Sequence, residues 1–342
     1  MANIARAWNL SRMINPAKRS PIGSRKRFLA KSALLAAAAL CALPGLSAQA
    51  QGRVKPFTVV ETGKTYKTLQ EAVHAIGDAR GTIRIANGTH RQCAVQERGV
   101  ITYLAAESGK AVLAGKACEG KAGLVLRGIG AEVRGITFRD YQVPDGNGAG
   151  IRLERGQLNI AYARFLDSQQ GILTGNDANS QIFIIRSTFS GLGTCENSAG
   201  CAHSIYTGDY GKLTVLESRF ERGRGGHYLK ARSGNVVIEN NSFDDAAGIQ
   251  TNYMIDLPSG AVGSIANNWF VQGQSKENYS AFIAVGAEQG IYNSDGLRIV
   301  NNEARFVPGV RRNSAFVADW TGARVQMANN RLAAGLTKYE RR

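Results

Sequence analysis

The chain has 342 residues, of which 44% are hydrophobic, 40 are glycine and only 7 are proline. This composition excludes a disordered chain or a proline-rich linker and favours a fold with many tight turns. The formal net charge is +16, but residues 1–50 hold eight basic side chains and no acidic one, so the remainder carries about +8. That charge favours an acidic partner and is too small to argue for nucleic-acid binding.

Residues 1–50 have the pattern of a signal peptide. A basic run at 25–27 precedes the apolar residues 32–41, and Ala48-Gln49-Ala50 matches an A-x-A cleavage site. The apolar run is too short to span a bilayer, so we expect no membrane span in the mature chain. The choice between the Sec and twin-arginine routes stays open, and either route predicts a periplasmic or secreted protein.

We predict that residues 51–342 form one domain, which begins with a cap near 57–90. Leu69, Ala72, Val73 and Ile76 are spaced as one face of a helix at about 68–77. Residues 82–86 then alternate as a strand. A repeat protein needs such a cap, because its first repeat otherwise exposes backbone groups and apolar side chains.

Four cysteines remain after the signal peptide: Cys93, Cys118, Cys195 and Cys201. In an oxidising compartment they predict two disulfides, with buried free thiols as the alternative. Three pairings are compatible with four cysteines; Cys195–Cys201 would close a short loop and leave Cys93–Cys118. A metal site at these cysteines is not expected, because no histidine has ligand spacing to either pair.

A short β-branched segment that ends in an apolar residue recurs along the chain every 23 to 34 residues. The copies end at Phe138, Phe165, Phe189, Phe220, Phe243, Phe270, Ala304 and Leu332. A second short strand precedes each copy, and no helical pattern lies between them, which excludes βαβ units. We therefore predict an all-β, right-handed parallel β-helix with rungs at about 100–335, at least seven of them within 124–332.

An Asn-Asn pair recurs in the later copies at 240–241, 267–268, 301–302 and 329–330. Asparagine tolerates the left-handed backbone that a sharp corner requires, and stacked copies can form a hydrogen-bonded ladder. The pair therefore predicts the corners of successive rungs.

The letters TYKTLQEAV (65–73) and GTIRIANGTH (81–90) resemble the cap helix and first strand of pectate-lyase-like right-handed parallel β-helix repeat proteins. NVVIENNSF (235–243) resembles their rungs. The resemblance covers about residues 57–335 and is greatest to uncharacterised exported proteobacterial members. It implies the fold and a carbohydrate-active role without naming a substrate.

Alignment of the second strands predicts an outward column that contains Tyr206, Lys230 and Asp256 on successive rungs. We expect four more residues, within these strands or next to their ends, to lie on the same solvent-facing side: His203, His227, Tyr228 and Arg232. We predict catalytic roles for Lys230, Arg232, His227 and Tyr206, and substrate binding by Tyr228, Asp256 and His203. An enzyme would need Tyr206, Lys230, Arg232 and Asp256 in one open groove.

These residue types suit β-elimination on an acidic, uronate-containing polysaccharide. That reaction needs a cation at the carboxylate, a base for the C5 proton and an acid for the leaving O4. Arg232 could neutralise the carboxylate, Lys230 could be the base, and Tyr206 or His227 could be the acid. The sequence favours a lyase over a hydrolase, although Asp244-Asp245 could supply paired carboxylates. It also favours a lyase over a uronate epimerase, whose Asp-Pro-His signature is absent.

The alternative is a non-catalytic β-helix that binds glycan or belongs to the cell envelope. Lys230 and Asp256 would then form a surface salt bridge, and the two histidines would be structural. No cofactor is expected, with Ca²⁺ at Asp140, Asp145 and Asn147 as the one alternative. We expect a monomer.

Overall fold

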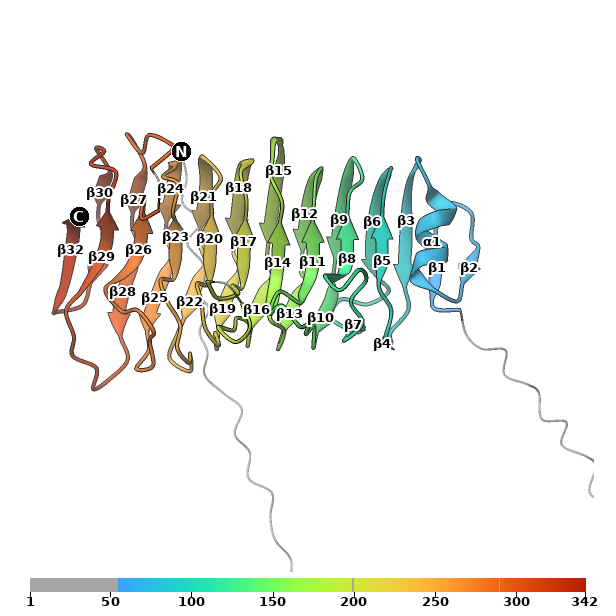
Figure 1. The fold of residues 1–342 in the computed structure, drawn as a ribbon, viewed down its shortest axis with the longest axis horizontal. Coiled ribbons are helices and arrows are strands. Elements are labelled where there is room, and N and C mark those ends of the chain that lie inside the picture. The colour runs from blue at the N-terminus through green and yellow to red at the C-terminus, as the bar shows by residue number, and fades with distance from the viewer. Residues whose placement is uncertain (1–54, 199, 289) are drawn as a thin grey trace, which may run out of the picture. The chain divides into compact units, whose positions relative to one another are not determined.

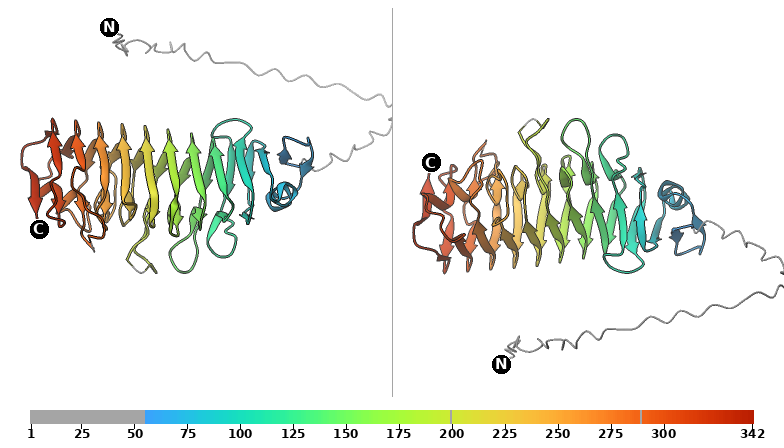
Figure 2. Two further views of the ribbon diagram at one scale, coloured as in Figure 1. Left: turned by 90° about the horizontal axis from the view of Figure 1, so that it is seen from above. Right: turned by 90° about the horizontal axis from the view of Figure 1, so that it is seen from below.

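The chain folds into short strands that belong to three long sheets, here named sheets A, B and C (Figures 1 and 2). The computed structural model describes residues 55–198, 200–288 and 290–342. The predicted signal peptide at 1–50 lies outside these residues.

Sheet A has twelve strands: β2 (Thr65–Tyr66), β1 (Phe57–Val59), β3 (Arg80–Ile85), β6 (Val100–Ala105), β9 (Gly130–Arg134), β12 (Gln157–Ala161), β15 (Asp177–Ile185), β18 (Tyr210–Leu216), β21 (Asn235–Glu239), β24 (Val262–Ala266), β27 (Arg298–Val300) and β30 (Gln326–Ala328). Sheet B has ten strands: β4 (Gly88–His90), β7 (Ala111–Ala114), β10 (Ile136–Arg139), β13 (Arg164–Leu166), β16 (Thr188–Ser190), β19 (Arg219–Glu221), β22 (Ser242–Asp244), β25 (Trp269–Gln272), β28 (Glu303–Phe306) and β31 (Arg331–Leu332). Sheet C also has ten strands: β5 (Ala94–Gln96), β8 (Ala122–Leu126), β11 (Ala149–Leu153), β14 (Gln170–Thr174), β17 (Ile205–Thr207), β20 (Leu229–Ala231), β23 (Ile255–Leu257), β26 (Ala281–Val285), β29 (Ser314–Asp319) and β32 (Leu336–Arg341).

Each rung consists of one strand from each sheet, and every strand from β3 onward pairs in parallel with its equivalent in the next rung. The ten rungs run from β3–β5 to β30–β32, which confirms the predicted parallel β-helix. No α-helix interrupts the rungs within the described residues. Longer loops project between β10 and β11 (green) and between β16 and β17 (yellow), as Figure 2 shows.

The rung contains three strands rather than the two that the sequence suggested. Each repeated segment that ends in an apolar residue is in fact two strands, one in sheet A and one in sheet B, separated by a sharp corner. The corner residue has positive φ, as at Tyr162 (+57°) and at Asn240 (+58°). A single left-handed residue turns the chain without changing the apolar pattern, so the sequence hid the break.

The Asn-Asn pairs form these corners as predicted. The first asparagine of each pair is left-handed, with φ between +54° and +58°. The side chain of the second asparagine links neighbouring rungs. That of Asn268 accepts a hydrogen bond from Asn241 N at 2.9 Å and donates one to Asn302 Oδ1 at 3.0 Å. Ser187 and Ser218 continue the ladder in earlier rungs.

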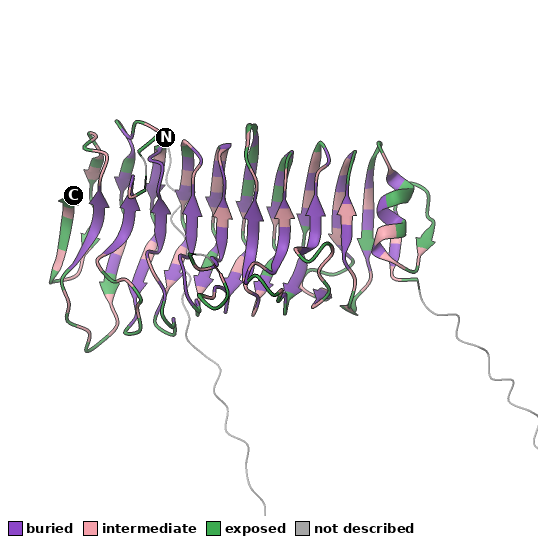
Figure 3. Ribbon diagram, viewed as in Figure 1, coloured by how far each residue is buried: buried purple, intermediate pink, exposed green. Residues whose placement is uncertain are grey.

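Apolar side chains from all three sheets fill the interior, and buried positions recur in the strands of the stack, alternating with more exposed ones on sheet A (Figure 3). Six phenylalanines of sheet B stack on consecutive rungs with ring centroids 4.7–5.1 Å apart: Phe138, Phe165, Phe189, Phe220, Phe243 and Phe270. Stacked rings at this spacing add a contact between every pair of rungs.

The cap also agrees with the sequence. Helix α1 (Leu69–Ile76) buries Leu69, Ala72, Val73 and Ile76, and Thr68 and Glu71 form a capping box at its start. Strands β1 and β2 are antiparallel and cover β3. The unpaired edge of the first rung is thereby closed.

Both predicted disulfides, Cys93–Cys118 and Cys195–Cys201, are present. Within the described residues, no helix is long and apolar enough to cross a membrane.

Candidate functional site

The predicted outward column lies on sheet C, where β17, β20 and β23 pair in register. Tyr206 lies opposite Lys230, and Lys230 lies opposite Asp256. The adjacent Ile205, Leu229 and Ile255 face the core with no exposed area. Strand alternation therefore places the column as predicted.

The charged groups of this column form one connected cluster. Lys230 Nζ lies 3.3 Å from Asp256 Oδ2, and Arg232 Nε donates to the Tyr206 hydroxyl at 2.9 Å. Glu288 joins the two cations, because one carboxylate oxygen accepts from Lys230 Nζ and the other from Arg232 Nη2. We call these five residues the sheet C cluster: Tyr206, Lys230, Arg232, Asp256 and Glu288.

Glu288 was missed by the sequence analysis. It follows β26 on an irregular segment, 58 residues from Lys230 and 56 from Arg232. One signal was available: the repeat that contains this segment, from Phe270 to Ala304, has the longest spacing in the chain, 34 residues. A long insertion can return to a neighbouring rung, but its contacts cannot be derived from a repeat pattern.

Two histidines lie at the starts of successive sheet C strands, behind the cluster. The ring centroids of His203 and His227 are 4.9 Å apart, and His203 Nδ1 accepts a hydrogen bond from His227 N at 3.0 Å. Burial, with the positive charge of Lys230, lowers the pKa of His203 to about 3. Burial also lowers the pKa of His227 well below its ordinary value, so both imidazoles are neutral at neutral pH.

Asp256 is the member of the sheet C cluster that contacts His227. Its Oδ2 is 3.4 Å from His227 Nε2 as well as 3.3 Å from Lys230 Nζ. Burial raises the pKa of Asp256 to about 6, although the charge of Lys230 acts in the opposite direction. The predicted proximity of Lys230, Arg232, Tyr206 and His227 is therefore found.

The predicted exposure of these residues is wrong in part. Lys230 is 9% exposed, His227 8%, His203 4% and Asp256 3%. Side chains on adjacent rungs cover one another, and Glu288 covers the outer side of Lys230. Tyr206 and Arg232 are half-buried, and Glu288 is exposed. The cluster thus has an open front and a closed back rather than one open groove.

The expected position of Tyr228 on this side is also wrong. Tyr228 is 1% exposed, and its hydroxyl donates to Asp245 Oδ1 at 2.8 Å and accepts from Gly223 N at 3.0 Å. The chain enters β20 through a corner at Gly225 and Gly226, both with positive φ, so strand alternation does not yet apply at Tyr228.

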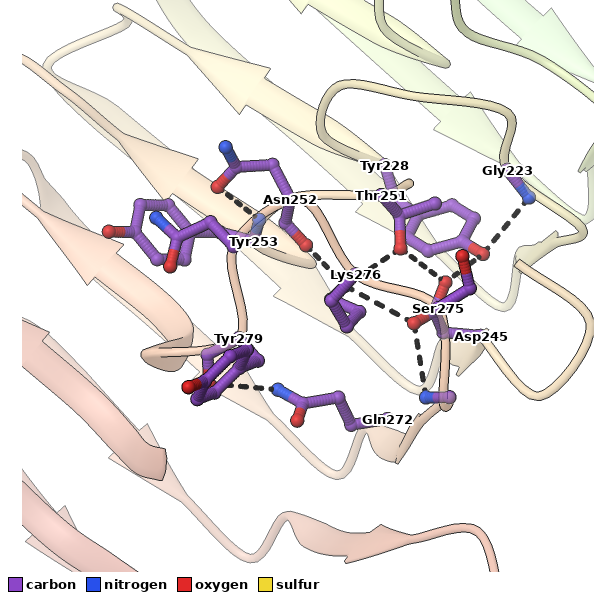
Figure 4. Close-up of polar contacts among 12 residues, drawn as sticks. Gly223, Tyr228, Asp245, Thr251, Asn252, Tyr253, Gln272, Ser275, Lys276 and Tyr279 are labelled. Atoms are coloured by element: carbon purple, nitrogen blue, oxygen red, sulfur yellow. Dashed lines mark hydrogen bonds and ion pairs between the residues drawn. The ribbon is translucent and has the colours of Figure 1, made fainter. Parts of the chain in front are cut away.

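A second group of charged side chains, of which the sequence analysis missed Lys276, is buried near Tyr228 (Figure 4). Lys276 Nζ lies 3.2 Å from Asp245 Oδ2, and the two side chains are 1% and 0% exposed. Thr251 donates to Asp245 Oδ1 at 2.7 Å and accepts from Lys276 Nζ at 2.8 Å. The charged groups of Asp245 and Lys276 are therefore paired with each other and with Thr251, and the network joins neighbouring loops.

This burial also bears on Asp244-Asp245, the pair that could have supplied the two carboxylates of a hydrolase. Asp244 accepts from Ala246 N at 3.1 Å, which is the Asx turn expected at a corner. Asp245 is fully buried, so the two carboxylates do not flank a site where a glycosidic bond could lie.

A hollow of about 680 Å³ opens between loops that connect sheet B to sheet C. Its lining includes Pro144, Glu196, Asn197, Arg224 and Ile249, and none of the seven residues predicted for catalysis or substrate binding. The candidate calcium ligands lie in the same region but do not converge: Asp140 pairs with Arg139, and Asp145 accepts from Asn147 N. Across the described ranges, no three His, Cys, Asp or Glu side chains are placed to hold a metal ion.

The match to a family model agrees with this fold. Residues 122–332 match the family described as right handed beta helix region, and the chain belongs to this family. Among solved structures, ORF18 of Geobacillus virus E2 is similar, with a TM-score of 0.48 and 16% identity over 81% of this chain. The alignment spans 57% of that viral protein. No curated protein matches.

Proposed function

We propose that this is an exported, pectate-lyase-like β-helix protein that acts on an acidic polysaccharide by β-elimination at the sheet C cluster. The observation that carries the proposal is the contact of two cations, Lys230 and Arg232, with a phenol and a buried carboxyl group on adjacent rungs. These groups are the ones that removal of a proton next to a carboxylate requires.

In this mechanism Arg232 binds the uronate carboxylate and withdraws charge from it. The Lys230 amine takes the C5 proton, the C5–H electron pair forms the C4=C5 double bond, the C4–O4 bond breaks, and the Tyr206 hydroxyl protonates O4. Asp256 supports Lys230 by positioning its amine, because Asp256 Oδ2 lies 3.3 Å from Lys230 Nζ.

The histidines take supporting roles in this proposal. A neutral, buried imidazole is a poor proton donor, which favours Tyr206 over His227 as the acid. His227 instead orients Asp256 through the contact of 3.4 Å, and His203 holds the backbone of His227. Tyr228 has no part in substrate binding here.

A non-catalytic role in glycan binding is the second candidate, and one observation favours it. Lys230, Asp256 and both histidines are less than one-tenth exposed, and Lys230 is paired within the protein. A binding protein needs only the front of the cluster, where Tyr206 and Arg232 are accessible.

The test is incubation with a panel of acidic polysaccharides, with the ultraviolet absorbance of the unsaturated product as readout. Tyr206→Phe should lower turnover by about a hundredfold or more and leave the melting temperature nearly unchanged. The matched control is Tyr162→Phe at the corner after β12, because Arg186 donates to Tyr162 at 2.9 Å, as Arg232 does to Tyr206. If the protein binds a polysaccharide but forms no unsaturated product from any of them, the lyase proposal is rejected and the glycan-binding role remains.

A further inference from the structure

The segment after β26, described at 286–288 and 290–297, lies along the turns between sheets C and A. Its backbone contacts include Glu288 N, which donates to Pro258 O at 3.1 Å, and Tyr292 N, which donates to Ser259 O at 2.8 Å. The Tyr292 hydroxyl reaches back to Asp209 at 2.6 Å, across 83 residues. These contacts hold the Glu288 side chain beside rungs that precede its own.

The contacts of Glu288 have the form of a bound carboxylate. One oxygen meets Lys230 Nζ and the other meets Arg232 Nη2, so a single carboxylate bridges two cations. The Glu288 side chain is 41% exposed, whereas that of Lys230 is 11% exposed and that of Asp256 4%. Glu288 therefore lies on the outside and closes access to the two groups behind it.

A salt bridge with no further role is the simpler account of a partly exposed Glu–Arg contact, and such contacts contribute little to stability. It does not account for Lys230. A lysine nine-tenths buried beside Asp256 already has a carboxylate partner, and Glu288 provides a second one from the solvent side. A second carboxylate position that solvent can reach is what an external acidic ligand would use.

We propose that Lys230 and Arg232 form a carboxylate-binding site and that Glu288 occupies it as an internal competitor until a uronate carboxylate displaces it. This inference rests on the proposed function in one respect only, namely that the ligand is a uronate. The internal carboxylate also sets specificity, because a neutral sugar has no group that can replace it at the two cations.

The test measures binding of sodium D-glucuronate, with D-glucose as the uncharged comparison, by ligand-observed NMR at low ionic strength. Glu288→Gln removes the competing charge and keeps the shape of the side chain. If Glu288 occupies the site about nine-tenths of the time, the variant should bind glucuronate about tenfold more tightly. Glucose binding should not change, and the added substitution Arg232→Gln should abolish the gain.

The matched control is Glu303→Gln, which removes a carboxylate from an exposed pair with Arg331 and should leave glucuronate binding unchanged. Glu288→Asp, which keeps the charge but shortens the reach, serves as a second variant and should give an intermediate affinity. A folded Glu288→Gln protein that binds glucuronate no better than the wild type would overturn the inference. Tighter glucuronate binding without cleavage of any polysaccharide would instead support it and reject the lyase.

Discussion

His203 and His227 place two titratable rings in the protein where neither can easily become charged. His203 is 4% exposed and lies near Lys230 and Arg232, whose charges add to the effect of burial on its pKa. In the unfolded chain the same imidazole takes up a proton below about pH 6.5. In the folded protein the pKa of His203 is about 3, so the imidazole stays neutral over this range. The folded state therefore loses stability as pH falls from about 6.5 toward 3.

His203→Asn should reduce this acid sensitivity. Asparagine Oδ1 can accept the hydrogen bond from His227 N that His203 Nδ1 accepts, but it cannot be protonated in this range. The free energy of unfolding of wild type and variant should agree above pH 6.5 and diverge below it, with the variant more stable. Asp256 titrates in both proteins, so its contribution cancels in the difference.

Urea unfolding at pH values above and below 6.5 provides the measurement. The control is His74→Asn on α1, which removes an exposed imidazole by the same substitution. Parallel pH profiles for wild type and His203→Asn would show that His203 does not limit stability in acid.

At this scale the sequence predicted positions better than environments. The alternation of Ile205-Tyr206 and Leu229-Lys230 was sufficient to place the column on sheet C. The partners Glu288 and Lys276 could not be predicted, because both lie on irregular segments whose path depends on packing rather than on a repeat. The burial of Lys230 follows from Glu288 and was missed with it.

Among the elements, the corner between sheets A and B does most to define the repeat. The second asparagine of each pair links neighbouring corners, and Asn268 also donates to Ile238 O at 2.8 Å. The recurring letters predicted both the corner and the ladder. They did not show that a third strand begins there, because one left-handed residue leaves the apolar pattern continuous.

Asn268→Ala should destabilise the protein by on the order of 3 kcal/mol, because the buried Asn241 N loses its acceptor and Asn241 Nδ2 and Ile238 O each lose a hydrogen bond. Asn267→Gly is the adjacent control: Asn267 is exposed and left-handed (φ +55°), a conformation that glycine adopts freely. Chemical denaturation of both variants checks this. Equal stability of the two would mean that the ladder contributes nothing net.

In the molecule as a whole, each rung contacts only the rungs beside it, so local stability should depend on position in the stack. The two ends of the described stack differ. The first rung is covered by α1, β1 and β2, whereas β30, β31 and β32 each have a strand partner on one side only. Met327, Leu332, Leu336 and Tyr339 of this last rung are only partly buried.

Backbone amides of β30–β32 should therefore exchange with solvent faster than those of β3–β5, and those of β18–β23 should be the slowest. Tyr339→Phe sharpens the test, because the Tyr339 hydroxyl donates to buried Asp319 of the preceding rung. The substitution should speed exchange in β32 and β29 and leave β3–β5 unchanged. Hydrogen exchange followed by mass spectrometry resolves these segments. An equal increase in every rung would instead mean that the stack opens as one cooperative unit, in which neighbouring contacts do not limit how far a local change spreads.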